Sequence, residues 1–203
     1  MKILNLYAGI GGNRKLWGDV DEVTAVEFDE QIAKIYKDNF PKDKVIIGDA
    51  HQYLLEHFRE FDFIWSSPPC PTHSRIRKSL AFKKDKAGNI YEQNKPVYPD
   101  MKLYEEILFL QHYYDGYYCI ENVLPYYEPL IEAQKIGRHL FWCNFKINGD
   151  YHKSGEHNGT IKELEKCKGF DLSNYNKIDK RKLLRNCVEP EVGKLIYEAI
   201  PNK

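Results

Sequence analysis

Ile3-Leu4-Asn5-Leu6-Tyr7-Ala8-Gly9-Ile10-Gly11-Gly12 is an apolar strand that runs directly into a glycine-rich turn. Glycines permit a tight turn and let the backbone approach a bound ligand closely. Their spacing is not the G-x-G-x-x-G pattern of dinucleotide-binding turns, so it does not favour NAD. A glycine cluster can also be an ordinary turn, and the rest of the chain has to decide between the two interpretations.

Short apolar runs and helical patterns alternate through the rest of the chain. We expect strands over residues 3–7, 23–26, 45–47, 61–65, 117–120 and 140–147. We expect helices through residues 16–17, from 29 to 41, near 53–58, over 101–114 and 129–135, and from 189 onward. This alternation predicts an α/β fold with a mainly parallel sheet and helices on both faces.

Polar or glycine residues stand at the ends of five expected strands. They are Gly9, Glu27, Asp49, Cys70 and Glu121. Ligands of parallel α/β sheets bind at the carboxyl ends of the strands. We therefore expect these five positions to share one active site.

Composition sets limits on the partners. The 203 residues carry 30 Lys+Arg and 30 Asp+Glu, so the net charge of zero gives no general attraction to polyanions. The five cysteines form no C-x-x-C pair, and His152, His157 and Cys167 form no close ligand pairs, so we expect no metal. No apolar run reaches membrane-spanning length. We expect a soluble, cytoplasmic, monomeric protein with a single core.

Two segments carry the chemistry, and each follows an expected apolar strand. They are Ser66-Ser67-Pro68-Pro69-Cys70-Pro71 and Glu121-Asn122-Val123. A thiol nucleophile and a nearby acid are what addition to an electron-poor ring requires. A lone cysteine is more often a small buried apolar residue, which is how we interpret Cys119. Cys70 differs because prolines flank it and a basic stretch follows, whose cations would lower its pKa.

Together with the glycine-rich start, these segments resemble the cytosine-C5 methyltransferase family, in its minimal bacterial or phage form. The resemblance implies a Rossmann-like fold that binds S-adenosylmethionine. It implies that Cys70 adds to C6 of a flipped cytosine, that Glu121 protonates N3, and that Asn122 holds the Pro69-Cys70 backbone. Methylation of an amino group is disfavoured, because Ser67-Pro68-Pro69-Cys70 lacks the acid or amide and the aromatic residue of the D/N-P-P-aromatic motif.

The S-adenosylmethionine site is expected at the first three strand ends. Glu27 is placed to accept hydrogen bonds from a ribose diol, and Asp49 is placed to bind an adenine amino group. Either acid could instead be a helix N-cap or a surface charge, but the three features in order favour this cofactor. In the resembled family, Tyr7 would line the pocket and the closing helix would pack beside it. The expected cofactor-binding residues are Tyr7, Gly9, Gly11, Gly12, Glu27, Asp49, Pro69 and Asn186.

Two later segments resemble family motifs, with departures. Arg138 matches the second arginine of an R-x-R segment and would support the cytosine O2, whereas Ile136 replaces the first arginine. Residues 183–190 resemble a Q-x-G-N-x-V-x-P segment that keeps Asn186 but has Arg185 in place of Gly. The expected catalytic residues are Cys70, Glu121, Asn122 and Arg138.

A base inside a duplex must leave the stack before it can be methylated. Residues 71–99 are too long for an ordinary connection, so we expect a mobile catalytic loop. We expect 148–180 to be a reduced target-recognition segment, beside a catalytic domain of 1–147 and 181–203. Nucleic-acid contacts are expected from Ser74, Arg75, Arg77, Lys78, Lys83, Lys84 and Arg185. Such charge runs can also be no more than solvated loops.

The expected activity is DNA cytosine-C5 methylation, with double-stranded DNA as the partner and restriction–modification as a fitting context. One branch of the resembled family acts on tRNA with the same motifs, so an RNA substrate stays an alternative. A catalytically silent nucleic-acid-binding protein is a second alternative. Ile136 and Arg185 favour the silent protein, whereas the presence of Cys70 and Glu121 opposes it.

Overall fold

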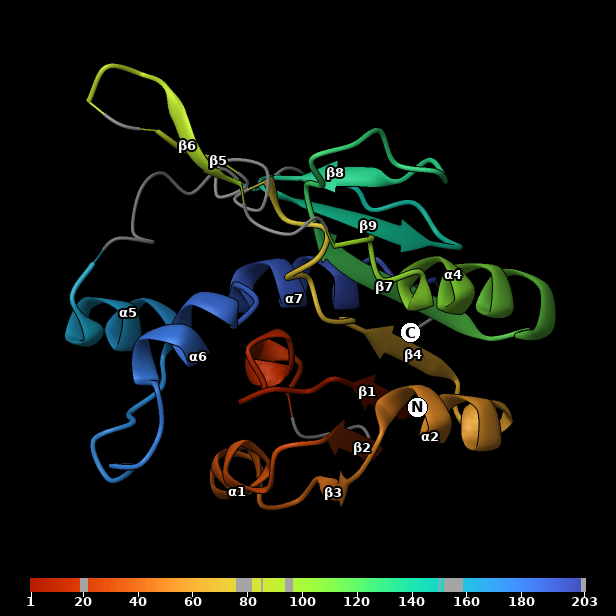
Figure 1. Ribbon diagram of the computed structural model, residues 1–203. Helices are drawn as coiled ribbons and strands as arrows, with labels where there is room; N and C mark the ends of the chain where they lie inside the picture. The colour runs from red at the N-terminus through yellow and green to blue at the C-terminus, as the bar shows by residue number, and fades with distance from the viewer. Residues whose placement is uncertain are drawn as a thin grey trace.

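A seven-stranded sheet organises the molecule (Figure 1). The computed structural model describes residues 1–18, 22–75, 82–84, 86–93, 97–149, 151 and 159–201. The strand order is β3-β2-β1-β4-β7-β9-β8. The strands of this sheet are β1 (Lys2–Leu6), β2 (Glu22–Glu27), β3 (Lys44–Ile47), β4 (Phe63–Ser66), β7 (Tyr117–Val123), β8 (Gln134–Ile136) and β9 (His139–Cys143).

In this order, the strands from β3 to β7 are parallel to one another, and β9 runs antiparallel to β7 and to β8. The α/β fold with a mainly parallel sheet is therefore confirmed. A second, two-stranded antiparallel sheet, β5 (Phe82–Lys84) with β6 (Ile90–Gln93), lies inside the expected 71–99 loop.

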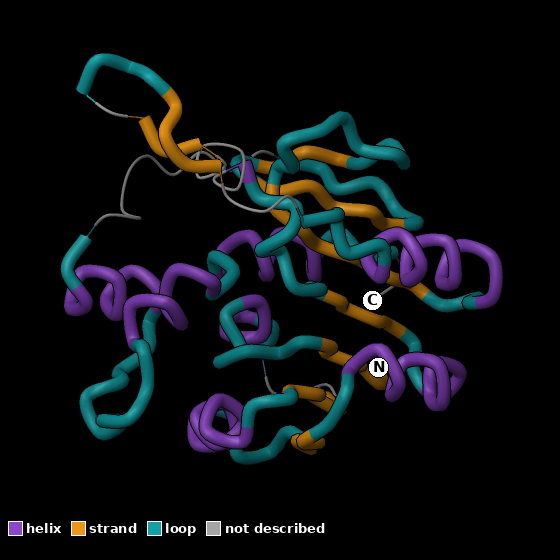
Figure 2. Tube along the Cα trace, in the orientation of Figure 1, coloured by secondary structure: helices purple, strands orange, loops and turns teal. Residues whose placement is uncertain are grey.

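Helices cover both faces of the large sheet (Figure 2). The helices are η1 (Asn13–Leu16), α1 (Glu30–Asn39), α2 (Ala50–His57), η2 (Phe58–Glu60), α4 (Lys102–Tyr113), α5 (Ile161–Lys168), α6 (Lys180–Asn186) and α7 (Pro190–Glu198). On one face, α2 and α4 pack on β1, β4 and β7 through residues such as Leu54 and Ile107. On the other face, η1 and α7 pack on the same strands through Trp17 and Ile196. Because both faces are covered, the central strands are mostly apolar, and Asn5, Glu121 and Asn122 are buried polar exceptions.

Two strand-end aspartates begin the helices that follow. The side chain of Asp29 accepts hydrogen bonds from the amides of Gln31 and Ile32 at the start of α1. Asp49 does the same for His51 and Gln52 at the start of α2. A carboxylate at this position satisfies amides that have no partner within the helix and interacts favourably with the helix dipole.

The prediction of a helix over residues 129–135 is wrong. Residues 134–136 form β8 instead, and Gly137 (φ 55°) and Arg138 make the two-residue hairpin turn into β9. The Gln134 side chain fixes this strand by donating to the Phe145 carbonyl and accepting from the Ile147 amide. A glycine with positive φ in a two-residue turn is typical of a β-hairpin.

The strands β7 and β9 begin or end at other residues than expected. β7 continues through residues 121–123, because those residues pair with β9, and β9 itself ends at Cys143. Glu121 consequently lies within a strand and not after one.

The described part of the 148–180 segment packs onto the main body. α5 begins with a capping box formed by Thr160 and Glu163, and Asp179 caps the start of α6. Leu164 and Leu172 join Ile10 and Ile35 in one apolar cluster, so this part covers α1 and the glycine turn. His152 and His157 lie outside the described residues. No helix in the described ranges is long and apolar enough to cross a membrane.

Candidate active site

The Cys70 segment forms a turn that is held against β7. The amides of His73 and Ser74 both donate to the Cys70 carbonyl, at 3.0 and 3.1 Å. The side-chain amide of Asn122, which is buried, donates to the Pro68 carbonyl at 3.0 Å. Asn122 was expected to hold the Pro69-Cys70 backbone, and the hydrogen bond is made one residue earlier, at Pro68. It joins the end of β4 to β7 and so fixes Cys70 relative to Glu121.

Glu121 and Cys70 lie close enough to interact electrostatically. Burial raises the pKa of the Cys70 thiol, and the charge of Glu121 raises it further. The expectation that neighbouring cations lower this pKa is therefore wrong for the described residues. Arg75 illustrates the reason, because its exposed side chain turns to the Pro125 carbonyl, with Nε 3.2 Å from the oxygen.

Sequence reasoning missed His139 as a member of this site. Its Nε2 lies 3.6 Å from Oε1 of Glu121. The expected strand began at residue 140, which left His139 outside the sheet, whereas β9 begins at His139 and places it on the face of Glu121. The sequence did offer one signal: His139 and Phe141 are two residues apart, and residues at that spacing in a strand lie on the same face.

Arg138 projects from the β8–β9 turn and is exposed. Partial burial lowers the pKa of its guanidinium, Glu189 raises it, and Arg185 lowers it. Its charged neighbours thus come from the C-terminal segment. The role expected for Arg138 at the cytosine O2 remains a prediction.

The glycine turn meets Glu27 at the neighbouring strand end. Oε2 of Glu27 accepts from the Gly9 amide at 2.9 Å, and Oε1 accepts from the Asp29 amide at 3.0 Å. Gly9 (φ 55°) has open space where a side chain would begin, as a ligand site requires. Its neighbours serve packing, because a Cβ on Gly11 would lie 2.3 Å from Phe40 and one on Gly12 would lie 2.3 Å from Cys187.

Tyr7 connects this turn to a buried carboxyl group that sequence reasoning did not single out. Its hydroxyl donates to Oε1 of Glu106 on α4 at 2.6 Å. Glu106 is fully buried and also accepts from Ser66 Oγ at 2.6 Å, and it lies 3.1 Å from Nδ1 of His51. Burial, followed by Glu106, raises the pKa of Tyr7. The network therefore joins the ends of β1 and β4 to α2 and α4.

An exposed apolar side chain lies close in sequence to each of the two acids Glu27 and Asp49. Phe28 follows Glu27 and is 77% exposed, and Ile47 precedes Asp49 by two residues and is 56% exposed. Backbone hydrogen bonds, first that from Gln52, lower the pKa of Asp49. An aromatic ring and a carboxylate at one edge suit a base with an amino group.

The remaining expected residues are placed as follows. Asn186 and Arg185 are exposed at the end of α6. Ser74 forms an isolated β-bridge with Pro125, and the Thr72 hydroxyl accepts from the Asp100 amide, which closes the base of the 71–99 loop. Lys83 and Lys84 lie in β5, with side chains outside the described set, and the described residues do not include Arg77 and Lys78.

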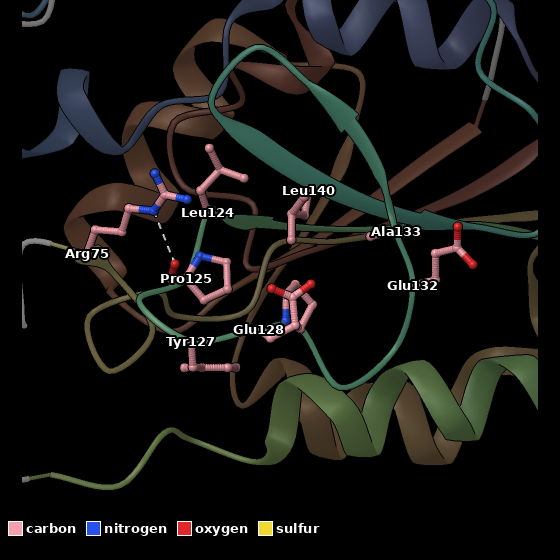
Figure 3. A pocket seen from close by; sticks show the side chains of 9 residues that line it. Arg75, Leu124, Pro125, Tyr127, Glu128, Glu132, Ala133 and Leu140 are labelled. Atoms are coloured by element: carbon pink, nitrogen blue, oxygen red, sulfur yellow. Dashed lines mark hydrogen bonds between the residues drawn. The ribbon is translucent and has the colours of Figure 1, made fainter.

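A cavity of about 410 Å³ lies beside the loop that follows β7 (Figure 3). Its lining includes Arg75, Leu124, Glu128 and Leu140, but not Cys70 or Glu121. Leu140 belongs to the apolar cluster under α4, so this cavity is on the other sheet face from the Glu121 side chain. Across the described ranges, no cluster of His, Cys, Asp and Glu could hold a metal ion.

Residues 1–97, which include the glycine turn and the Cys70 segment, match the family model of the C-5 cytosine-specific DNA methylases. This match places the N-terminal part of the chain, residues 1–97, in the cytosine-C5 methyltransferase family. S-adenosylmethionine is the cofactor of this family. The open space at Gly9, the Glu27 carboxylate and the exposed Phe28 fit its methionine, ribose and adenine parts.

Curated relatives include enzymes for both nucleic acids. The type II methyltransferase M.Bsp6I of Bacillus sp. (strain RFL6) is 32% identical over 94 residues, which cover 45% of this chain and 30% of that protein. The tRNA (cytosine(38)-C(5))-methyltransferase of Spodoptera frugiperda is 34% identical over 85 residues, covering 39% and 26%. The similarity thus spans less than a third of either relative.

Among solved structures, a mutant of Spodoptera frugiperda DNMT2 is similar to this chain. It is 19% identical and aligns over 84% of this chain and 66% of that chain, with a TM-score of 0.45. The fold assignment rests on the strand order described above.

Proposed function

We propose that the protein transfers a methyl group from S-adenosylmethionine to C5 of cytosine in double-stranded DNA. One observation carries the proposal. Cys70 and Glu121 come together at the same sheet edge as Gly9 and Glu27. With the roles proposed for them, these residues would bring a nucleophile, an acid and a cofactor site together, which is what methylation at a weakly nucleophilic ring carbon requires.

Cys70 and Glu121 have complementary tasks in this mechanism. The Cys70 thiolate forms a bond to C6, and electrons move through the ring to N3, which takes a proton from Glu121. This makes C5 nucleophilic. After loss of the C5 proton to a base, the bond to Cys70 breaks and the N3 proton returns to Glu121. Asn122 keeps the two groups in register through Pro68.

The cofactor supplies an electrophilic methyl group when bound. Glu27 would accept hydrogen bonds from the ribose hydroxyls, and Asp49 would accept one from the adenine amino group. Phe28 would cover one face of the adenine ring, which explains an aromatic side chain left in solvent. Tyr7 would form the wall below, held by Glu106.

The target base has to be extruded from the helix to reach Cys70. The 71–99 loop, with Ser74, Arg75 and the lysines of β5, would hold the phosphates on either side. Residues 148–180 would contribute target recognition as a short segment attached to α1, and Arg185 lies at the end of α6 close to it. Arg138 would support the cytosine O2.

DNA is our choice of substrate because of the methylase model and the type II relative. The tRNA methyltransferase matches a similar share of the chain, so tRNA is the competing substrate to be tested.

The decisive experiment is covalent trapping with duplex DNA and tRNA that contain 5-fluorocytosine. Fluorine at C5 blocks release, so attack by Cys70 leaves a protein–nucleic-acid adduct that a denaturing gel detects. We expect an adduct with the DNA, dependent on S-adenosylmethionine, in wild type and in Cys167→Ser, but none in Cys70→Ser. An adduct with tRNA alone would replace the DNA assignment. No adduct on either polymer, despite cofactor binding, would favour a silent nucleic-acid-binding protein.

A further inference from the structure

The interaction between Glu121 and His139 follows directly from the sheet register. Glu121 is opposite Phe141 and Val123 is opposite His139, so the two side chains are diagonal neighbours on one face. Diagonal neighbours in an antiparallel pair are within reach of long side chains. The observed separation of 3.6 Å between Nε2 and Oε1 agrees with that geometry.

His139 lies on the solvent side of this pair. The side chain of Glu121 is 10% exposed and that of His139 is 22% exposed. The rings of Phe141 and Trp65 pack in series below, with the Phe141 ring also against the imidazole. Below the pair the residues are apolar, so His139 lies between Glu121 and the more exposed side of the site.

The Glu121–His139 pair also bears on the formation of the Cys70 thiolate. The reaction needs a Cys70 thiolate, but the charge of Glu121 opposes the formation of one. A single proton on the Glu121–His139 pair makes the pair neutral, whichever side chain carries it. The thiolate can then form while a proton remains available for the cytosine ring.

We propose that His139 is a second acid–base residue, which shares with Glu121 the proton that Glu121 delivers to cytosine N3. This inference rests on the proposed function. As Cys70 Sγ bonds to C6, the shared proton moves from Oε of Glu121 to N3, leaving a carboxylate that accepts a hydrogen bond from neutral His139. When Cys70 leaves, the proton returns from N3 to the pair, so neither residue is changed over a cycle.

Two thiols in the described part of the chain interact electrostatically with Glu121. Cys70 faces Glu121 from its loop, and Cys119 faces it from the same strand, with its pKa raised by burial and then by Cys143 and Glu121. Arg138, next to His139 along the chain, has Glu189 and Arg185 as its charged neighbours. His139 is the ion-pair partner that the structure shows for Glu121.

The first test measures alkylation of Cys70 by iodoacetamide at pH 7.5, followed by mass spectrometry, and needs no nucleic acid. In His139→Gln we expect alkylation to slow by about tenfold, because an unopposed carboxylate suppresses the thiolate. In a Glu121→Gln background the same change should have little effect. The exposed His112 on α4 gives the matched control, His112→Gln. Equal rates in wild type and His139→Gln would overturn the proposal.

The second test is the pH profile of methyl transfer by wild type and His139→Gln. Glutamine keeps a donor to Glu121 but cannot store a proton, so activity should fall about tenfold or more at pH 8 and stay close to wild type at pH 6. The same loss at every pH, with an unchanged unfolding midpoint, would mean a merely structural role. Absence of methyl transfer by the wild type would overturn the proposed function. The alkylation rates of the single and double variants would still show whether His139 and Glu121 act together on Cys70.

Discussion

The hydroxyl of Tyr7 donates a 2.6 Å hydrogen bond to the fully buried carboxyl group of Glu106, ninety-nine residues away in the chain. Tyr7 has a positive φ of 53°, an unusual backbone conformation for a non-glycine residue. The bond therefore holds the start of the glycine turn in a conformation that its own sequence does not favour. Since Ser66 and His51 bind the same carboxyl group, the turn, the strand before Cys70 and α2 are fixed together.

We expect Glu106→Ala to lower the free energy of unfolding by about 2–4 kcal/mol, because it leaves buried donors without an acceptor. Tyr7→Phe should cost about 1 kcal/mol, since a single donor is lost. Urea denaturation with both variants measures this. Glu105→Ala, at an exposed position beside Glu106, is the control, and an equal loss in Glu105→Ala would contradict the role of the network.

His51 predicts a dependence of stability on pH. Its pKa is raised, first by the hydrogen bond with Glu106. A group with a raised folded-state pKa stabilises the protein fully below its unfolded pKa of about 6.5, and that contribution disappears as pH rises through the folded pKa. The stability difference between wild type and His51→Gln should be largest near pH 5.5 and should shrink toward pH 9. Urea unfolding at a series of pH values measures it, and a difference that grows with pH would contradict the assignment.

Phe28 should contribute to cofactor affinity. Stacking of an aromatic side chain on a base is worth about 1–3 kcal/mol, so Phe28→Ala should weaken S-adenosylmethionine binding by about tenfold or more in calorimetry. Leu130→Ala provides the comparison, because Leu130 is also an exposed large apolar residue, at 65%. Equal affinities in the two variants would remove Phe28 from the adenine site.

The sequence predicted those parts of the fold that depend on local pattern. The parallel strands, the cap at Asp29 and the helix opened by Pro190 all have signals within a few residues, and the structure confirms them. β8 was mistaken for a helix because its three residues are stabilised by pairing with β9 and by contacts from Gln134. α5 was missed although Thr160-Ile161-Lys162-Glu163 is a capping-box pattern.

The candidate site divides in the same way. Cys70, Glu121 and Glu27 could be proposed from the sequence because their residue types, at or near the ends of expected strands, indicate their chemistry; their roles stay predictions. His139 and Glu106 could not, since each belongs to the site through a partner that the chain brings close only after folding. The pKa of Cys70 was predicted in the wrong direction because burial and a carboxylate act on it, neither of which the basic residues after it reveal.

Glu121→Gln should therefore change two properties of the site in opposite directions. The variant removes the charge that raises the pKa of Cys70, so the pKa should fall and alkylation by iodoacetamide at pH 9, where the pair no longer holds a shared proton, should accelerate by about threefold to tenfold. Methyl transfer should nevertheless slow by about 10²-fold, because glutamine cannot protonate N3. Glu198→Gln, at an exposed glutamate on α7, should leave both rates unchanged. A thiol that reacts more slowly in Glu121→Gln would mean that Glu121 activates Cys70, and the acid role would then have to pass to another residue.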